Sequence, residues 1–138
     1  MILVSACLAG INCRYDGSNN YISKVKKLVN EGKAVAVCPE VIAGLDIPRV
    51  PAEIRKVNDN KKVINAEGSD LTEEFNTAAV KCLKIAKLLD IRLAILKSKS
   101  PSCGFGSIYD GSFSNRLIPG NGFTADLLHK NNIKIYTE

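Results

Sequence analysis

The stretch YISKVKKLVNEGKAVAVC, residues 21–38, decides the fold of this 138-residue chain, because it joins a helix directly to a buried strand. In its first part, apolar residues recur at three- and four-residue steps between lysines, and Gly32 follows at a C-cap position. This pattern is typical of an amphipathic helix over 21–32. The second part, AVAVC at 34–38, is a short apolar run, as is ILVSA at 2–6 before the helix. Strand, helix and strand in this order predict two parallel strands joined by a right-handed crossover.

The rest of the chain extends this unit into an α/β domain. Residues 39–54 contain three prolines and a glycine, so we expect an irregular connection there. The predicted fold is a three-layer α/β/α Rossmann-like sandwich on a mainly parallel sheet, formed by residues 1–138 as a single domain with a small inserted hairpin. The further predicted elements are a hairpin at 54–65, a long helix at about 70–90 capped by Ser69 or Asp70, a strand at 92–97, a helix at 124–130 and a strand at 133–137.

Composition narrows the functional classes. An apolar content of 46% with 24% charged residues is ordinary for a globular protein, and no apolar run approaches the ~20 residues of a spanning helix. The N-terminus lacks a basic leader and a cleavage site, so we expect a cytoplasmic protein with no membrane partner. The net charge of +5 permits an anionic partner, but the lysines are dispersed and a nucleic-acid surface is not expected. The sequence does not indicate an oligomeric state.

Three of the five cysteines follow predicted strands. Cys7 comes directly after the first strand, Cys38 ends the second, and Cys103 lies six residues after the strand at 92–97. Ligands bind an open parallel sheet beyond the carboxyl ends of its strands, where the loops converge. We therefore expect these three thiols at one end of the sheet, and this favours a metal or thiol-chemistry site over three separate core cysteines.

The other candidate ligands are less informative. Cys82 shares the apolar face of the long helix and is predicted to be a core residue, while Cys13 is a fourth site thiol, a substrate-facing group or a spectator. The sole histidine, His129, is expected on the surface, so a four-ligand structural zinc site lacks an obvious fourth ligand. A [4Fe–4S] cluster held by three thiolates would keep one iron without a protein ligand.

Polar residues near these thiols are candidates for the chemistry. Glu40, two residues after Cys38, is either a general acid or base or a helix N-terminal acid. Ser100 and Ser102 flank Pro101, and they either donate hydrogen bonds to a ligand or cap turns.

Two further side chains are assigned on local sequence. The tripeptide YDG occurs at 15–17 and 109–111; it indicates tight turns, and its second aspartate, Asp110, is a candidate substrate-binding residue together with Ser102. Arg49, framed by prolines, either reaches an anion or pairs with Glu53, and of the two the ion pair is the expected use.

Four ordered segments resemble one family across nearly the whole chain. The resemblance is to the domain-of-unknown-function 523 (DUF523) family, whose characterised members are TudS-type thiouracil desulfidases. The segments are SACLAGINCRYDG (5–17), CPEVIAGLDIPRVPAEI (38–54), SPSCGFGSIYDGSF (100–113) and GNGFTADLL (120–128).

The resemblance implies a cofactor, a reaction and site residues. It implies a [4Fe–4S] cluster on Cys7, Cys38 and Cys103, with the substrate's sulfur binding the open iron. Water then replaces sulfur on a thiolated nucleobase such as 2-thiouracil without net redox, with Glu40 as the acid/base group and Ser100 assisting. Two alternatives stay open: a cysteine-based zinc-binding or redox-sensing module without catalysis, and a site to which a basic face presents thiolated tRNA.

Overall fold

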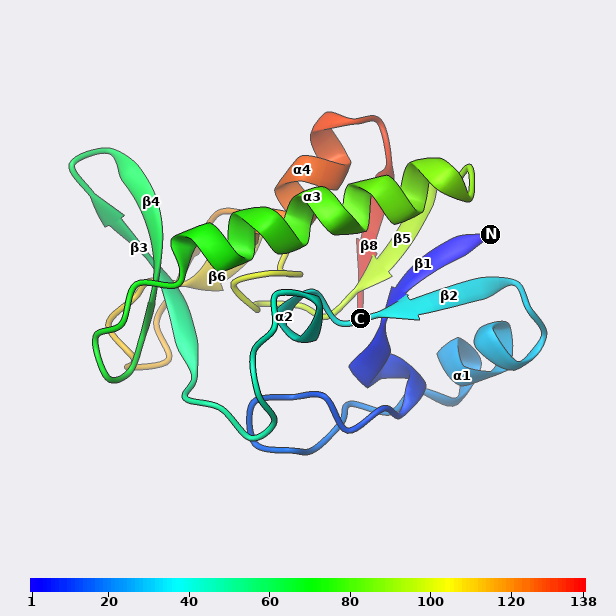
Figure 1. Cartoon of the computed structure of the whole chain (residues 1–138), viewed down its shortest axis with the longest axis horizontal. Helices are drawn as coiled ribbons and strands as arrows, with labels where there is room; N and C mark the ends of the chain where they lie inside the picture. The colour runs from blue at the N-terminus through cyan, green and yellow to red at the C-terminus, as the bar shows by residue number, and fades with distance from the viewer.

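The computed structural model describes residues 1–138 and is organised around a four-stranded parallel sheet in the order β2–β1–β5–β8 (Figure 1). Leu3 on the central strand β1 lies opposite Val35 on one side and Ala94 on the other. The predicted parallel pairing is therefore confirmed. The four strands are β1 (Ile2–Ser5), β2 (Ala34–Val37), β5 (Leu93–Leu96) and β8 (Lys134–Thr137).

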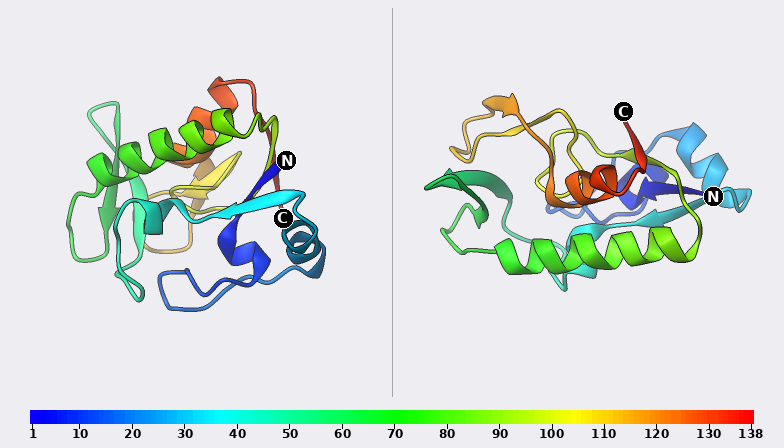
Figure 2. Two further views of the ribbon diagram at one scale, coloured as in Figure 1. Left: turned by 45° about the vertical axis from the view of Figure 1, so that its right-hand side comes forward. Right: turned by 90° about the horizontal axis from the view of Figure 1, so that it is seen from above.

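Helices cover both faces of this sheet, as expected for three layers. In Figures 1 and 2, α3 (Thr72–Leu88) and α4 (Phe123–Lys130) lie on one side and α1 (Ser23–Asn30) lies on the other. Because successive strand residues point to opposite faces, Leu3 packs into the apolar cluster under α3 and α4, whereas Val4 packs into the cluster under α1. No helix in the chain is long and apolar enough to cross a membrane.

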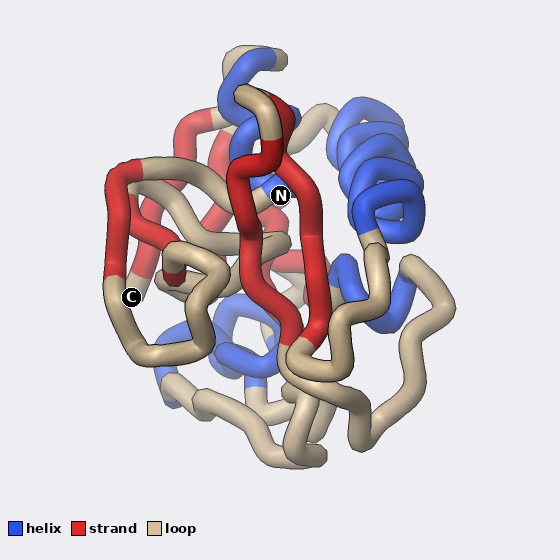
Figure 3. Tube along the Cα trace, turned by 90° about the vertical axis from the view of Figure 1, so that its left-hand side faces the viewer, coloured by secondary structure: helices blue, strands red, loops and turns tan.

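The inserted hairpin is confirmed. It consists of β3 (Ala52–Val57) and β4 (Asn60–Asn65), which pair antiparallel and project from the start of α3 (Figure 3). Asn58 and Asp59 between them both have positive φ, the conformation of a two-residue hairpin turn. A small apolar cluster that includes Ile54, Val63, Phe75 and Ile108 joins the hairpin to the rest of the domain.

A second hairpin was not predicted. β6 (Ser107–Tyr109) and β7 (Leu117–Pro119) pair antiparallel within a stretch that the sequence suggested was a loop. Each strand has only three residues in a segment rich in serine and glycine, so no alternating pattern marks it.

The first turn after each of the first two sheet strands is also helical, as η1 (Ala6–Ala9) and α2 (Pro39–Ile42).

The long helix is shorter than predicted at its start. It begins at Thr72, with Leu71 at the N-cap position, and not at 70. The Asp70 side chain nevertheless accepts a hydrogen bond from the Thr72 amide at 2.9 Å, so it satisfies one of the free donors of the first turn.

Candidate functional site

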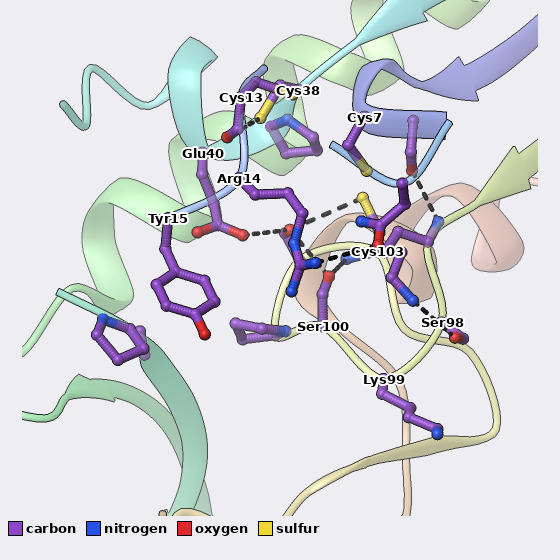
Figure 4. Close-up of a pocket in the computed structure, with 18 of the residues that line it drawn as sticks. Cys7, Cys13, Arg14, Tyr15, Cys38, Glu40, Ser98, Lys99, Ser100 and Cys103 are labelled. Carbon is purple, nitrogen blue, oxygen red and sulfur yellow. Dashed lines mark hydrogen bonds between the residues drawn. The ribbon is translucent and has the colours of Figure 1, made fainter. Parts of the chain in front are cut away.

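A cavity of about 530 Å³ lies beyond the carboxyl ends of β1, β2 and β5 (Figure 4). Its walls come from η1 and the loop after it, from α2, and from the loop at 97–104 that follows β5. Four of the five cysteines line it, and they include the three that the strand pattern placed at this end of the sheet: Cys7, Cys13, Cys38 and Cys103. The volume falls within the range of about 300–1,000 Å³ that is usual for small-molecule sites.

The loop that carries Cys103 packs tightly against the start of α4. The Ser102 carbonyl accepts hydrogen bonds from the Thr124 and Ala125 amides at 2.9 and 3.1 Å. A Cβ at Gly122, the N-cap of α4, would lie 2.5 Å from the Ser102 carbonyl carbon, so only glycine permits this approach. The small residues of the segment therefore fix the position of Cys103 at the cavity wall.

Cys13 connects the thiols of two neighbouring loops. Its side chain is buried, and its backbone carbonyl accepts a hydrogen bond from the Cys38 thiol at 3.7 Å. Chiefly because of the neighbouring Cys13, the pKa of Cys7 is lowered to about 6 and that of Cys38 to about 7, while the pKa of Cys13 is raised. Lys97 and Arg14 lower the pKa of Cys7 further through their charge. The site thus favours thiolates at Cys7 and Cys38.

Cys103 has a different environment. It is buried, and burial raises the pKa of its thiol to about 12. Two serines contact it: the Ser102 hydroxyl lies 3.7 Å from its sulfur, and its amide donates to the Ser100 Oγ at 2.7 Å. In Figure 4 the side chains of Cys7 and Cys103 point toward one another across the cavity.

Glu40 lies in the first turn of α2 and also lines the cavity, so both roles expected for it are compatible with its position. Its Oε1 accepts a hydrogen bond from Arg49 Nε at 3.1 Å, and its Oε2 accepts one from Ser102 Oγ at 3.0 Å. A second guanidinium nitrogen of Arg49 donates to the Cys13 carbonyl at 2.8 Å. Arg49 therefore joins the carboxylate to the loop that carries Cys13.

The predicted pairing of Arg49 with Glu53 is wrong. Glu53 lies on the extended strand β3, where residues are spaced about 3.3 Å apart. Its buried carboxylate accepts hydrogen bonds from the Gly111 and Phe113 amides at 3.0 Å each. Glu53 thus holds the turn that follows β6, and the ion pair of Arg49 forms with Glu40 instead.

Two serines and the glutamate form a hydrogen-bonded row. Ser100 Oγ lies 3.3 Å from Ser102 Oγ, which in turn donates to Glu40. Because Ser100 Oγ already accepts from the Cys103 amide, its own proton is free to point toward Ser102 or into the cavity. Ser102 is only 2% exposed.

The remaining predicted residues lie elsewhere. Asp110 is not among the cavity-lining residues, and its carboxylate accepts from the backbone amide and the hydroxyl of Ser112 in the turn that YDG indicated. Cys82 is fully buried in α3 and outside the cavity, as predicted. His129 is exposed, also as predicted, and its ring lies 5.0 Å from that of Phe105.

Several polar residues of the cavity were not singled out from the sequence, among them Arg14, Asn20 and Lys97. Arg14 and Asn20 lie on the loop after η1, and Arg14 Nη1 donates to Asn20 Oδ1 at 3.1 Å. Lys97 directly follows β5 and pairs with Glu138. The only sequence signal for them is their closeness to Cys7, Cys13 and the 92–97 strand.

No three His, Cys, Asp or Glu side chains in the chain lie close enough together to hold a single metal ion.

Comparisons with known proteins agree with this arrangement. The model of the 2-thiouracil desulfurase family matches residues 2–138. The uncharacterized protein YbbK of Bacillus subtilis (strain 168) is 46% identical over 144 residues, which cover 100% of this chain and 95% of YbbK. The solved structure of the [4Fe-4S]-dependent thiouracil desulfidase TudS superposes with a TM-score of 0.91 at 42% identity, over 99% of this chain and 89% of that one. The chain therefore belongs to the 2-thiouracil desulfurase family.

Proposed function

We propose that this protein is an iron–sulfur enzyme that replaces the sulfur of thiouracil, or of a related thiolated nucleobase, by oxygen without net redox. The observation that carries the proposal is the convergence of Cys7, Cys38 and Cys103 on one cavity that also contains Glu40. The family match and the structural similarity to a [4Fe-4S]-dependent thiouracil desulfidase support both the reaction and the cofactor.

The residues of the cavity fit a [4Fe–4S] cluster. Thiolates are the usual ligands of such clusters, and the three proposed ligands reach the cavity from three separate segments of the chain. Basic side chains at Arg14 and Lys97 favour the ionised thiolate. When bound by three cysteines, the cluster would supply one iron without a protein ligand, able to act as a Lewis acid toward the substrate's sulfur. A zinc module is less well supported, since a compact set of ligands is absent.

Glu40 is the proposed general base. Arg49 and Ser102 each hold one of its carboxylate oxygens, so its orientation toward the cavity is fixed before substrate binds. In the overall reaction a C=S group and one water give a C=O group and H₂S, so no electrons are gained or lost. Glu40 would accept a proton from the attacking water as its oxygen bonds to the ring carbon.

Ser100 and Ser102 would carry protons between the substrate and Glu40. Ser102 donates to Glu40, and Ser100 lies within hydrogen-bonding distance of Ser102. We therefore assign Ser100 to the contact with the substrate, and Ser102, because it is buried, to the link behind it. This arrangement allows a proton released at Ser100 to reach the carboxylate without passing through solvent.

The test is anaerobic reconstitution with iron and sulfide, followed by a thiouracil assay. A broad absorption band near ~400 nm with about four irons and four sulfides per chain, and formation of uracil and sulfide, are the expected results. Stoichiometric zinc, or no cluster after complete anaerobic reconstitution, would contradict the proposal.

A further inference from the structure

Asn20 contains a buried donor that nothing in the protein satisfies. Its side chain lines the cavity, and its amide nitrogen Nδ2 is buried without a hydrogen-bond partner. Buried polar groups in native proteins are nearly always paired, so an unpaired donor at the wall of a cavity indicates an acceptor that is in place only when the cavity is occupied.

The orientation of this amide is fixed by Arg14. Arg14 Nη1 donates to Asn20 Oδ1 at 3.1 Å. Since a guanidinium only donates, the amide oxygen must face Arg14, and the amide nitrogen is left as the free group.

The backbone places the same residue against Cys7. The Asn20 amide donates to the Cys7 carbonyl at 2.9 Å, and two residues later Ile22 donates to the Leu8 carbonyl at 2.8 Å. The Asn20 side chain lines the same cavity as Cys7. The main chain thus holds Asn20 next to one of the proposed cluster ligands.

We propose that Asn20 Nδ2 donates a hydrogen bond to the sulfur of Cys7 when that cysteine holds the cluster, which makes Asn20 a positioning residue of the cofactor. The inference rests on the proposed function, because it requires a thiolate bound to iron. A second proposed ligand has a comparable neighbour, since the Ser102 hydroxyl lies 3.7 Å from the Cys103 sulfur. Donors of this kind orient metal ligands and stabilise their negative charge.

The consequence is measurable without the reaction. A hydrogen bond to a ligand sulfur stabilises the more negative, reduced cluster, so it raises the reduction potential. The reconstituted full-length chain is therefore compared as wild type, Asn20→Leu, Asn20→Ala and Asn12→Leu, by spectroelectrochemistry with iron counts and far-UV circular dichroism. Asn20→Leu keeps the size of the side chain without a donor. Asn12 is the control, because it is an exposed amide of the same loop that does not line the cavity.

We expect both Asn20 variants to have a more negative reduction potential than wild type, and Asn12→Leu to match wild type. Equal potentials in all four proteins would overturn the inference. An unchanged potential with a raised KM for thiouracil would also overturn it, since the amide would then serve the substrate. A wild-type chain that takes up no cluster would refute the proposed function itself, and with it this inference.

Discussion

The loop at 97–104 and the middle of helix α3 each contain one buried cysteine. Cys103 and Cys82 belong to the same apolar cluster, and burial raises the pKa of each thiol to about 12. The two cysteines differ in what surrounds them outside this shared cluster. Cys103 lines the cavity and is flanked by two serine hydroxyls, whereas Cys82 is enclosed by the core.

This difference shows which features identify a site thiol. Burial and a raised pKa are shared by both cysteines, so they do not separate a structural thiol from a ligand. Contact with the cavity is found only at Cys103, whose sulfur also lies 3.7 Å from the Ser102 hydroxyl at the cavity wall. The comparison can be tested directly, because each cysteine can be removed alone.

The largest effect is expected for Cys103→Ala. Without this thiolate the cluster loses one of its three protein ligands, so we expect complete loss of the visible absorption band and of desulfurase activity. Far-UV circular dichroism should be unchanged, because the substitution leaves the four-stranded sheet and its helices intact. Iron and sulfide counts after anaerobic reconstitution measure the loss of the cluster.

Cys82→Ala is the matched control for that variant. It is expected to keep the cluster and to lower the free energy of unfolding by about 0.5–3 kcal/mol, as removal of a buried sulfur from a packed core does. If Cys82→Ala lost the cluster and Cys103→Ala kept it, the distinction between the two cysteines would be wrong.

Glu40→Gln tests whether cluster binding and catalysis depend on different residues of the cavity. Glutamine can keep contacts with Arg49 and Ser102 but cannot accept the proton of the attacking water. We expect full cluster content and a fall in kcat of about 10²–10⁴-fold, which is typical for loss of a general base. Single-turnover kinetics of the reconstituted variant would measure this. Activity near that of wild type would remove Glu40 from the mechanism.

The sequence predicted the positions of the three thiols in this cavity better than the contacts of Arg49 and Asn20. Cys7, Cys38 and Cys103 could be placed together because each follows a strand, and parallel strands end at the same edge. The partner of Arg49 was missed because the choice between Glu40 and Glu53 depends on how a proline-rich loop turns, and no short-range pattern records this. The same holds for Asn20, which approaches Cys7 only through the return of its loop.

The β6–β7 hairpin was missed for another reason. Its two strands are held by backbone pairing and by the carboxylate of Glu53, which comes from a distant strand. The strands themselves have only three residues each, so tertiary contacts and not local propensity determine them.

Ser102→Ala should have a smaller effect than Glu40→Gln. It removes a hydrogen bond to the carboxylate and interrupts the link to Ser100, but the base itself remains. Loss of a hydrogen bond to a charged group is worth about 1.5–3 kcal/mol, so kcat is expected to fall about 10- to 100-fold while the cluster is retained. Ser100→Ala in parallel, and the double variant, test the relay: if the two serines act in one row, the double variant will be little slower than the slower single variant.

The smallest effect on activity is expected for Cys13→Ala, a third buried cysteine that lines the cavity without being a proposed ligand. The cluster should form, because three thiolates remain. The apo-protein should differ, however, since the nearby Cys13 side chain is the main reason that the pKa values of Cys7 and Cys38 lie at about 6 and 7. Its loss should move the midpoint of the pH dependence of iodoacetamide alkylation upward at both residues, as followed by peptide mass spectrometry, while Cys82→Ala leaves it unchanged. A Cys13 variant that forms no cluster would show instead that this thiol is itself a ligand, and that contact with the cavity outweighs the strand-end pattern in deciding which cysteines bind.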